Sequence, residues 1–130
     1  MEIKKSYISL KDLEVYQLSR ELSKIGWDIY KNMDWQTKKV IGDQFIRALD
    51  SIGANITEGY FRYHYLDKVK FYYYARGSLG ESCEHWLELL RERELIQDKT
   101  FQEIKSIANK LSIKLNNFIS SVYKAKQNQQ

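Results

Sequence analysis

The sequence predicts an all-α protein, an antiparallel up-and-down bundle of four helices. The 130 residues contain no proline and only 6 glycines, so the commonest helix-breaking residues are scarce. Apolar residues recur at spacings of three and four along four stretches that short breaks separate. With 43% apolar and 29% charged residues the chain has a globular composition, and we expect one domain over residues 1–130.

The first predicted helix covers residues 10–31. Ser9 and Asp12 at its start resemble a capping box, and residues 1–8 before it have no apolar period, so they predict an irregular arm. Its apolar stripe consists of Leu13, Tyr16, Leu22, Ile25 and Ile29. A break follows at residues 32–36, where Asp34 or Thr37 is the expected cap of the next helix and Trp35 is expected to pack beside the turn.

The second predicted helix covers residues 38–58 and carries two stripes of opposite character. The apolar stripe consists of Phe45, Leu49, Ile52 and Ile56, and the polar stripe of Gln44, Arg47, Ser51, Asn55 and Glu58. The polar stripe predicts a row between packed helices, with a ligand site as the alternative. Gly42 and Gly53 indicate close helix approach, and Gly59 is expected in the left-handed conformation that ends a helix.

The third and fourth predicted helices follow an aromatic and basic connection, Tyr60–Tyr65. The third begins at residue 66 or 67 and ends at 93–95; its expected inward residues are Phe71, Tyr74, Ala75, Ser78, Leu79, Ser82, Trp86 and Leu89 or Leu90. Thr100 and Glu103 form a capping box for the fourth helix, residues 101–124. The glutamine-rich end, residues 125–130, is expected to fray.

The net charge of +4 comes from the fourth helix. From residue 101 onward five lysines accompany Glu103 as the only acidic residue. Lys110, Lys114 and Lys124 project away from the apolar stripe of Ile104, Leu111, Leu115, Phe118 and Val122. Such a row suits phosphates or acidic protein, and the alternative is that it only keeps the helix soluble.

Several classes of protein do not fit the sequence. No run of apolar residues is long enough for a membrane span, and the start lacks the apolar core of a signal peptide, so we expect a cytoplasmic location. Glu81, Glu84, His85 and Glu88 could meet on one helix, but a solvated cluster is commoner there than a metal site. The sequence places no general base that would activate the Cys83 thiol as a nucleophile. We therefore predict no enzyme, no metal and no cofactor.

Three groups of residues carry a resemblance to a known family. The first is Gln44-Phe45-Ile46-Arg47-Ala48 with Ser51-Ile52, Asn55-Ile56-Thr57-Glu58-Gly59 and Arg62. The second is Phe71, Ala75, Gly77-Ser78 and Glu81, and the third is Leu13, Val15-Tyr16, Ser19, Leu22 and Ile29-Tyr30. Together they resemble the four helix bundle protein family, which includes proteins encoded in intervening sequences of bacterial 23S ribosomal RNA genes. The chain departs from the family pattern at Tyr63-His64-Tyr65.

The resemblance implies a ring-shaped homo-oligomer, commonly a homopentamer, with no established enzymatic activity. A similar protein is the accessory variability determinant of diversity-generating retroelements, which binds nucleic acid and its reverse transcriptase through a positive surface. The residues give a separate reason to expect assembly, because 10 Tyr, 5 Phe and 3 Trp exceed the needs of one small core. Tyr72 and Tyr73 lie off the expected stripe, and Ile113 lies on the charged side of its helix.

Two hypotheses on function follow. In the first, a ring binds RNA or DNA: Lys110, Lys114 and Lys124, with Arg62 and Arg76, contact phosphates, while Tyr60, Phe61 or Tyr63 stack on unpaired bases or pack between subunits. In the second, the chain is a scaffold for a protein partner such as a polymerase or ribosomal protein. A polar network is expected first to fix helix or subunit register and only second to bind a ligand; its members are Arg47, Asn55, Glu58, Arg62 and Glu81.

Overall fold

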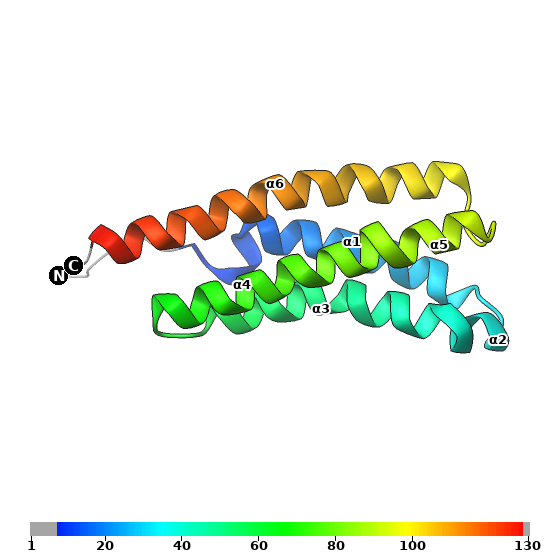
Figure 1. Ribbon diagram of the computed structural model, residues 1–130, viewed down its shortest axis with the longest axis horizontal. Coiled ribbons are helices and arrows are strands. Elements are labelled where there is room, and N and C mark those ends of the chain that lie inside the picture. The colour runs from blue at the N-terminus through cyan, green and yellow to red at the C-terminus, as the bar shows by residue number, and fades with distance from the viewer. Residues whose placement is uncertain (1–7, 129–130) are drawn as a thin grey trace.

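The computed structural model of the chain describes residues 8–128, and within them it is an all-helical bundle without strands. Four long helices form it: α1 (Glu14–Lys31), α3 (Asp43–Tyr60), α4 (Tyr65–Gly80) and α6 (Asp98–Asn128). Figure 1 shows that they run alternately in opposite directions along the long axis. α1 packs against α3 and α6, and α4 packs against the same two helices, so the order around the bundle follows the chain. The predicted all-α bundle is confirmed.

Two of the helical rods contain π-helical segments that the sequence analysis did not predict. α2 (Trp35–Thr37) continues through a π-helical segment, Lys38–Gly42, into α3. α4 likewise continues through Glu81–Trp86 into α5 (Leu87–Glu92). Because a π-helical turn holds extra residues, each segment shifts which side chains face the core. The second and third predicted helices are therefore observed as rods over residues 35–60 and 65–92.

The apolar stripe of α3 lies at the centre of the core. Phe45, Leu49, Ile52 and Ile56 are completely buried, as their spacing predicts. Leu22 of α1 and Leu111 of α6 are equally inaccessible, so the helices close over one common interior.

The expected inward face of the third helix is partly wrong. Tyr72, predicted to lie off the stripe, is 1% exposed, and its ring lies 4.9 Å from that of Phe118. Phe71 and Tyr74, predicted to point inward, are half-buried and exposed, respectively. Residues 71–75 read Phe-Tyr-Tyr-Tyr-Ala, so almost every position there is apolar or aromatic and the stripe has no clear phase. The burial of Tyr72 raises the pKa of its hydroxyl.

Glycines mark the closest approaches of α3 to its neighbours. A Cβ on Gly53 would lie 2.9 Å from Ser19 Oγ of α1, and one on Gly42 would lie 2.6 Å from Met33 Sδ, which agrees with the close packing predicted for both. The predicted left-handed conformation of Gly59 is wrong. No glycine among the described residues has a positive φ, and α3 continues past Gly59 to Tyr60. Its hydrogen faces Tyr72, whose ring a Cβ would approach to 2.6 Å.

Of the three predicted helix caps, the structure confirms one. Asp34 accepts a hydrogen bond from the Thr37 backbone N–H at 2.7 Å, as predicted. Ser9 does not cap: its hydroxyl donates to the Asp12 carboxylate, and a short 3₁₀ turn, Leu10–Asp12, precedes α1. The Thr100–Glu103 capping box is also wrong, because α6 already begins at Asp98. Trp35 is 74% exposed and does not pack beside the turn.

The structure tests the predictions for the two chain ends only in part. α6 continues to Asn128, so residues 125–128 of the expected frayed tail are helical; Ala125, Lys126 and Gln127 there are good helix formers. Of the expected arm, residues 1–7 lie outside the described residues, as do 129–130 of the tail. No helix in the range 8–128 combines the length and apolar character that crossing a membrane requires.

The end of α5 places an acidic residue where glycine is usual. The Glu94 N–H donates to the Arg91 carbonyl at 3.0 Å, and the Leu95 N–H donates to the Leu90 carbonyl at 2.8 Å. These two bonds form a Schellman motif, which requires a left-handed residue, and Glu94 supplies it with φ of 58°. A side chain at this conformation carries a steric cost.

We predict that Gly59→Ala lowers the free energy of unfolding by about 2 kcal/mol, because the added methyl overpacks the contact with Tyr72 and the Lys68 carbonyl oxygen. Gly77→Ala is the matched control, since a Cβ there meets nothing within 4 Å and should stabilise α4 by about 0.5–1 kcal/mol. Urea unfolding followed by circular dichroism measures both. Equal effects of the same sign would contradict the close approach.

We predict that Glu94→Gly raises the free energy of unfolding by about 1 kcal/mol, because glycine adopts the left-handed conformation without steric cost. Glu94→Ala keeps a Cβ and should give little or none of this gain. The midpoints of urea denaturation report the difference. A gain from alanine as large as that from glycine would assign the effect to the lost charge instead.

Candidate functional site

The exposed side of α6 is a positively charged surface. From Ile104 to Asn128 the helix contains five lysines and no acidic residue. Lys110, Lys114 and Lys124 are exposed, while Ile104, Leu111 and Leu115 are buried, which confirms the predicted separation of the two faces. Asn117, three residues after Lys114, is exposed on the same side and adds a hydrogen-bond donor. This side of α6 is therefore suited to anions.

Glu14 of α1 lies beside two of these lysines. Its carboxylate oxygens are 3.8 Å from Lys110 Nζ and 3.5 Å from Lys114 Nζ. All three side chains remain about half exposed, so each ion pair contributes little to stability. Glu14 competes with any external anion for Lys110 and Lys114. Helical periodicity could not predict this contact, because α1 and α6 are distant along the chain.

Lys105 plays a different part from the other lysines of α6. Its ammonium donates to the Cys83 carbonyl at 2.8 Å and forms ion pairs with Glu84 at 3.1 Å and Glu88 at 3.0 Å. Burial on its own lowers the pKa of Lys105, but the hydrogen bonds that its ammonium donates to Glu88 and Glu84 outweigh burial and raise the pKa. Lys105 thus ties α6 to the third helical rod, a role that the sequence analysis missed.

The predicted acidic cluster near Cys83 does not form a ligand site. Glu84 and Glu88 face Lys105, and Glu81 accepts a hydrogen bond from Trp86 Nε1 at 2.9 Å. Within residues 8–128 no three His, Cys, Asp or Glu side chains are placed to hold a metal ion. Cys83 is buried, and this burial raises the pKa of its thiol to about 11, which disfavours the thiolate.

The two arginines predicted to contact phosphates lie apart from Lys110 and Lys114. Arg76 donates to Asn116 Oδ1 at 3.1 Å, which places it where α4 meets α6, and its guanidinium lies over the Tyr73 ring. Arg62 lies at the α3–α4 turn, pairs with Glu58 at 3.1 Å and covers the Phe71 ring. Lys110 and Lys114 instead face α1. The five predicted residues therefore do not form a single patch.

The polar residues of α3 bond mainly within their own helix. The Ser51 hydroxyl donates to the Arg47 carbonyl at 2.7 Å, and Asn55 Nδ2 donates to the Ser51 carbonyl at 2.9 Å. Among the described residues, no hydrogen bond or ion pair joins Arg47, Asn55 or Glu58 to Glu81 on the neighbouring rod. Of the expected network, the described residues show the Arg62–Glu58 ion pair but no link to Glu81, and a role between subunits stays a prediction.

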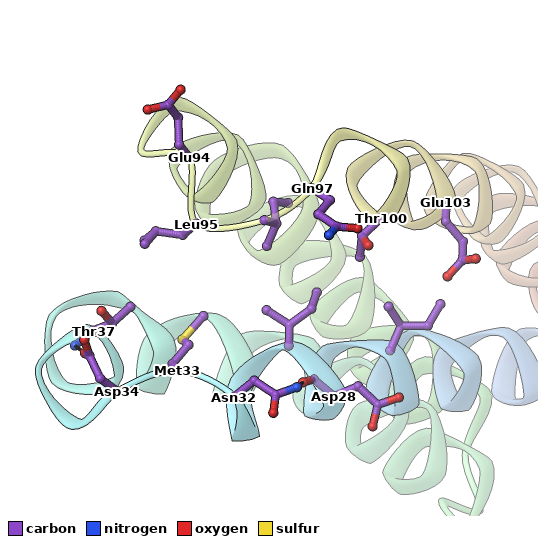
Figure 2. A pocket seen from close by; sticks show the side chains of 13 residues that line it. Asp28, Asn32, Met33, Asp34, Thr37, Glu94, Leu95, Gln97, Thr100 and Glu103 are labelled. Carbon is purple, nitrogen blue, oxygen red and sulfur yellow. Dashed lines mark hydrogen bonds between the residues drawn. The ribbon is translucent and has the colours of Figure 1, made fainter.

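A cleft of about 650 Å³ opens at the end of the bundle where α1 meets the α5–α6 connection. Figure 2 shows Gln97, Thr100 and Glu103 on one side and Asn32, Met33 and Asp34 on the other. Ile25, Ile29 and Ile96 complete its apolar lining. The carboxylate of Glu94 points away from the opening, so the acidic residues around the cleft do not converge on one point.

Comparisons with known proteins find a matching family model and similar solved structures. The sequence model of the family described as "23S rRNA-intervening sequence protein" matches residues 11–117. A solved structure from Bacteroides thetaiotaomicron, a protein of unknown function from the S23 ribosomal protein family, is similar with a TM-score of 0.75 and 27% identity. The match covers 82% of this chain and 95% of that one. Among curated proteins, none matches the chain.

We predict that the stability contributed by Lys105 is lost at alkaline pH. Because its pKa in the folded state is raised, this contribution is fully present below the ordinary value of 10.5 and disappears as pH rises through the higher folded value. The stability difference between the wild type and Lys105→Met should therefore shrink above pH 10.5. Arginine stays charged at these pH values, so the stability difference between Lys105→Arg and Lys105→Met should not shrink. Urea midpoints at pH values on both sides of 10.5 provide the measurement; parallel curves for all three proteins would contradict it.

Proposed function

This chain belongs to the 23S rRNA-intervening sequence protein family, and we propose that it is a non-enzymatic oligomer that binds RNA or DNA in the cytoplasm through the exposed side of α6. One observation carries the proposal: from Ile104 to the end of the described helix, lysines and side-chain amides occur without a single carboxylate. Phosphate groups are the commonest polyanionic partner of such a surface, and lysines neutralise them with release of counterions.

Lys110 and Lys114 are the residues that we expect to contribute most. They are one helical turn apart, so both ammonium groups can contact the same nucleic-acid backbone. Their exposed ion pairs with Glu14 are weak enough for phosphates to displace. Lys124 extends the same helix toward its end, while Arg62 and Arg76 would contact a strand that passes around the bundle.

Assembly into a ring would strengthen this binding. The resemblance described above implies a homopentamer, in which five copies carry a formal charge of about +20. Exposed apolar side chains such as Val40, Trp27 and Ile113 are candidates for burial between subunits. We propose that Arg47, Asn55 and Glu81 form further hydrogen bonds or ion pairs across the same interface.

A second candidate function is a scaffold for a protein such as a reverse transcriptase, without direct contact to nucleic acid. One observation favours it: Ile113 is 62% exposed between Lys110 and Lys114, where phosphates would leave it uncovered. An acidic protein surface with an apolar centre would cover all three residues.

We predict that removing positive charge from α6 weakens nucleic-acid binding and that removing negative charge from α1 strengthens it. Lys110→Gln with Lys114→Gln should weaken binding and reduce the slope of log affinity against log salt by about 1–2, because one or two phosphate contacts are lost. Glu14→Gln should strengthen binding, because it removes the carboxylate that competes for both lysines. Anisotropy titrations of labelled single-stranded RNA and duplex DNA at two salt concentrations measure these effects.

The matched control is Lys31→Gln, which removes an exposed lysine that pairs with Asp28 on α1, away from this surface. Light scattering checks that each variant keeps the assembled mass of the wild type. If the wild type binds neither ligand at low salt, the proposal is wrong and a protein partner becomes the better hypothesis. If it binds but the α6 variants do not differ from the control, the placement on α6 is wrong.

A further inference from the structure

The turn between α3 and α4 exposes more large apolar side chains than any other short segment that the structure describes. Phe61 is 70% exposed, Tyr63 87% and Leu66 59%. Together with His64, which is also exposed, these residues form what we call the aromatic turn. Figure 1 shows this turn at the end of the bundle toward which the last turns of α6 run. Three large apolar side chains exposed side by side to water are costly unless they have a partner.

The aromatic turn is held in place by bonds beneath it. Lys68 Nζ donates to the Tyr60 carbonyl at 2.7 Å and to the Gly59 carbonyl at 3.4 Å. The Tyr60 hydroxyl donates to the Ile8 carbonyl at 2.8 Å. Tyr60 meets Phe61 edge to face at 5.0 Å, and Tyr63 meets His64 in the same way. The rings are therefore oriented before any partner arrives, which lowers the entropy cost of binding.

Positive charge surrounds the aromatic turn. Arg62 lies within it, and Lys70 lies on the next turn of α4. α4 and α6 are antiparallel, and the Arg76–Asn116 hydrogen bond and the packing of Tyr72 on Phe118 set their relative position. Lys124 therefore lies level with the first turns of α4. Two acidic residues lie nearby: Glu58 is paired with Arg62, and Asp67 lies in the first turn of α4. Exposed rings among cations suit a partner that offers both flat faces and negative charge.

We infer that the aromatic turn is a stacking site for the unpaired bases of a single-stranded nucleic acid. This inference rests on the proposed function and adds the class of ligand. Unpaired bases present faces that stack on Phe61 and Tyr63, while the phosphates between them reach Lys70 and Lys124. A duplex hides its base faces inside the stack and gains only the phosphate contacts. The wild type should therefore prefer a single strand to the same sequence as a duplex.

The test uses the full chain and a labelled, unstructured RNA strand, alone or paired with its complement. Phe61→Ala with Tyr63→Ala should lower affinity for the single strand about tenfold or more and leave affinity for the duplex unchanged. Phe61→Tyr with Tyr63→Phe keeps both rings and should retain binding. Trp35→Ala is the matched control, because Trp35 is equally exposed but lies at the opposite end of the bundle.

Three results would overturn the inference. Equal losses for the single strand and the duplex, or no loss for either, would show that the rings do not stack on bases, while salt-dependent binding by the wild type would leave the proposed function standing. A changed mass of the alanine variant by light scattering would assign the rings to a subunit interface. If the wild type binds neither ligand at any salt concentration, both the proposed function and the inference fail.

Discussion

The burial of α3 is the constraint on which the rest of the structure depends. Its apolar stripe, from Phe45 to Ile56, is completely inaccessible, and α3 packs against both α1 and α4. Both contacts are close because glycines stand at the crossing points: Gly53 faces Ser19 of α1, and Gly59 faces Tyr72 of α4. A larger residue at either position would separate the helices and open voids around the stripe. The position of α4, and with it the aromatic turn, follows from this packing.

Polar chemistry is consequently confined to the outside of the bundle and to its ends. Only Ser19 and Ser82 are buried polar residues among those described, and each hydroxyl donates to a carbonyl of its own helix. The cleft beside α5 has acidic residues that do not converge, and the Cys83 thiol is buried. The exposed surfaces of the helices therefore carry most of the polar groups of the described residues.

The lysines of α6 have two different roles: one is structural, and others face solvent. Lys105 turns toward Glu84 and Glu88 and holds two rods together, with only 18% of its side chain exposed. Lys110 and Lys114 face solvent and share a single carboxylate from α1. In the sequence all three are lysines opposite an apolar stripe, and their neighbours on other helices decide which are structural and which can meet a partner.

The sequence by itself determined the helical class, the apolar stripes of α3 and α6 and the family, and it narrowed the cap of α2 to Asp34 or Thr37, because each depends on residues close together along the chain. It placed the lysines of α6 on the exposed side for the same reason. Only the tertiary structure decided that Tyr72 is internal, since the run from Phe71 to Ala75 contains apolar or aromatic residues at every position and has no readable phase. It also decided that Glu14 forms an ion pair with Lys110 and that Gly59 packs against the ring of Tyr72. Both are contacts between distant segments, which helical periodicity does not encode.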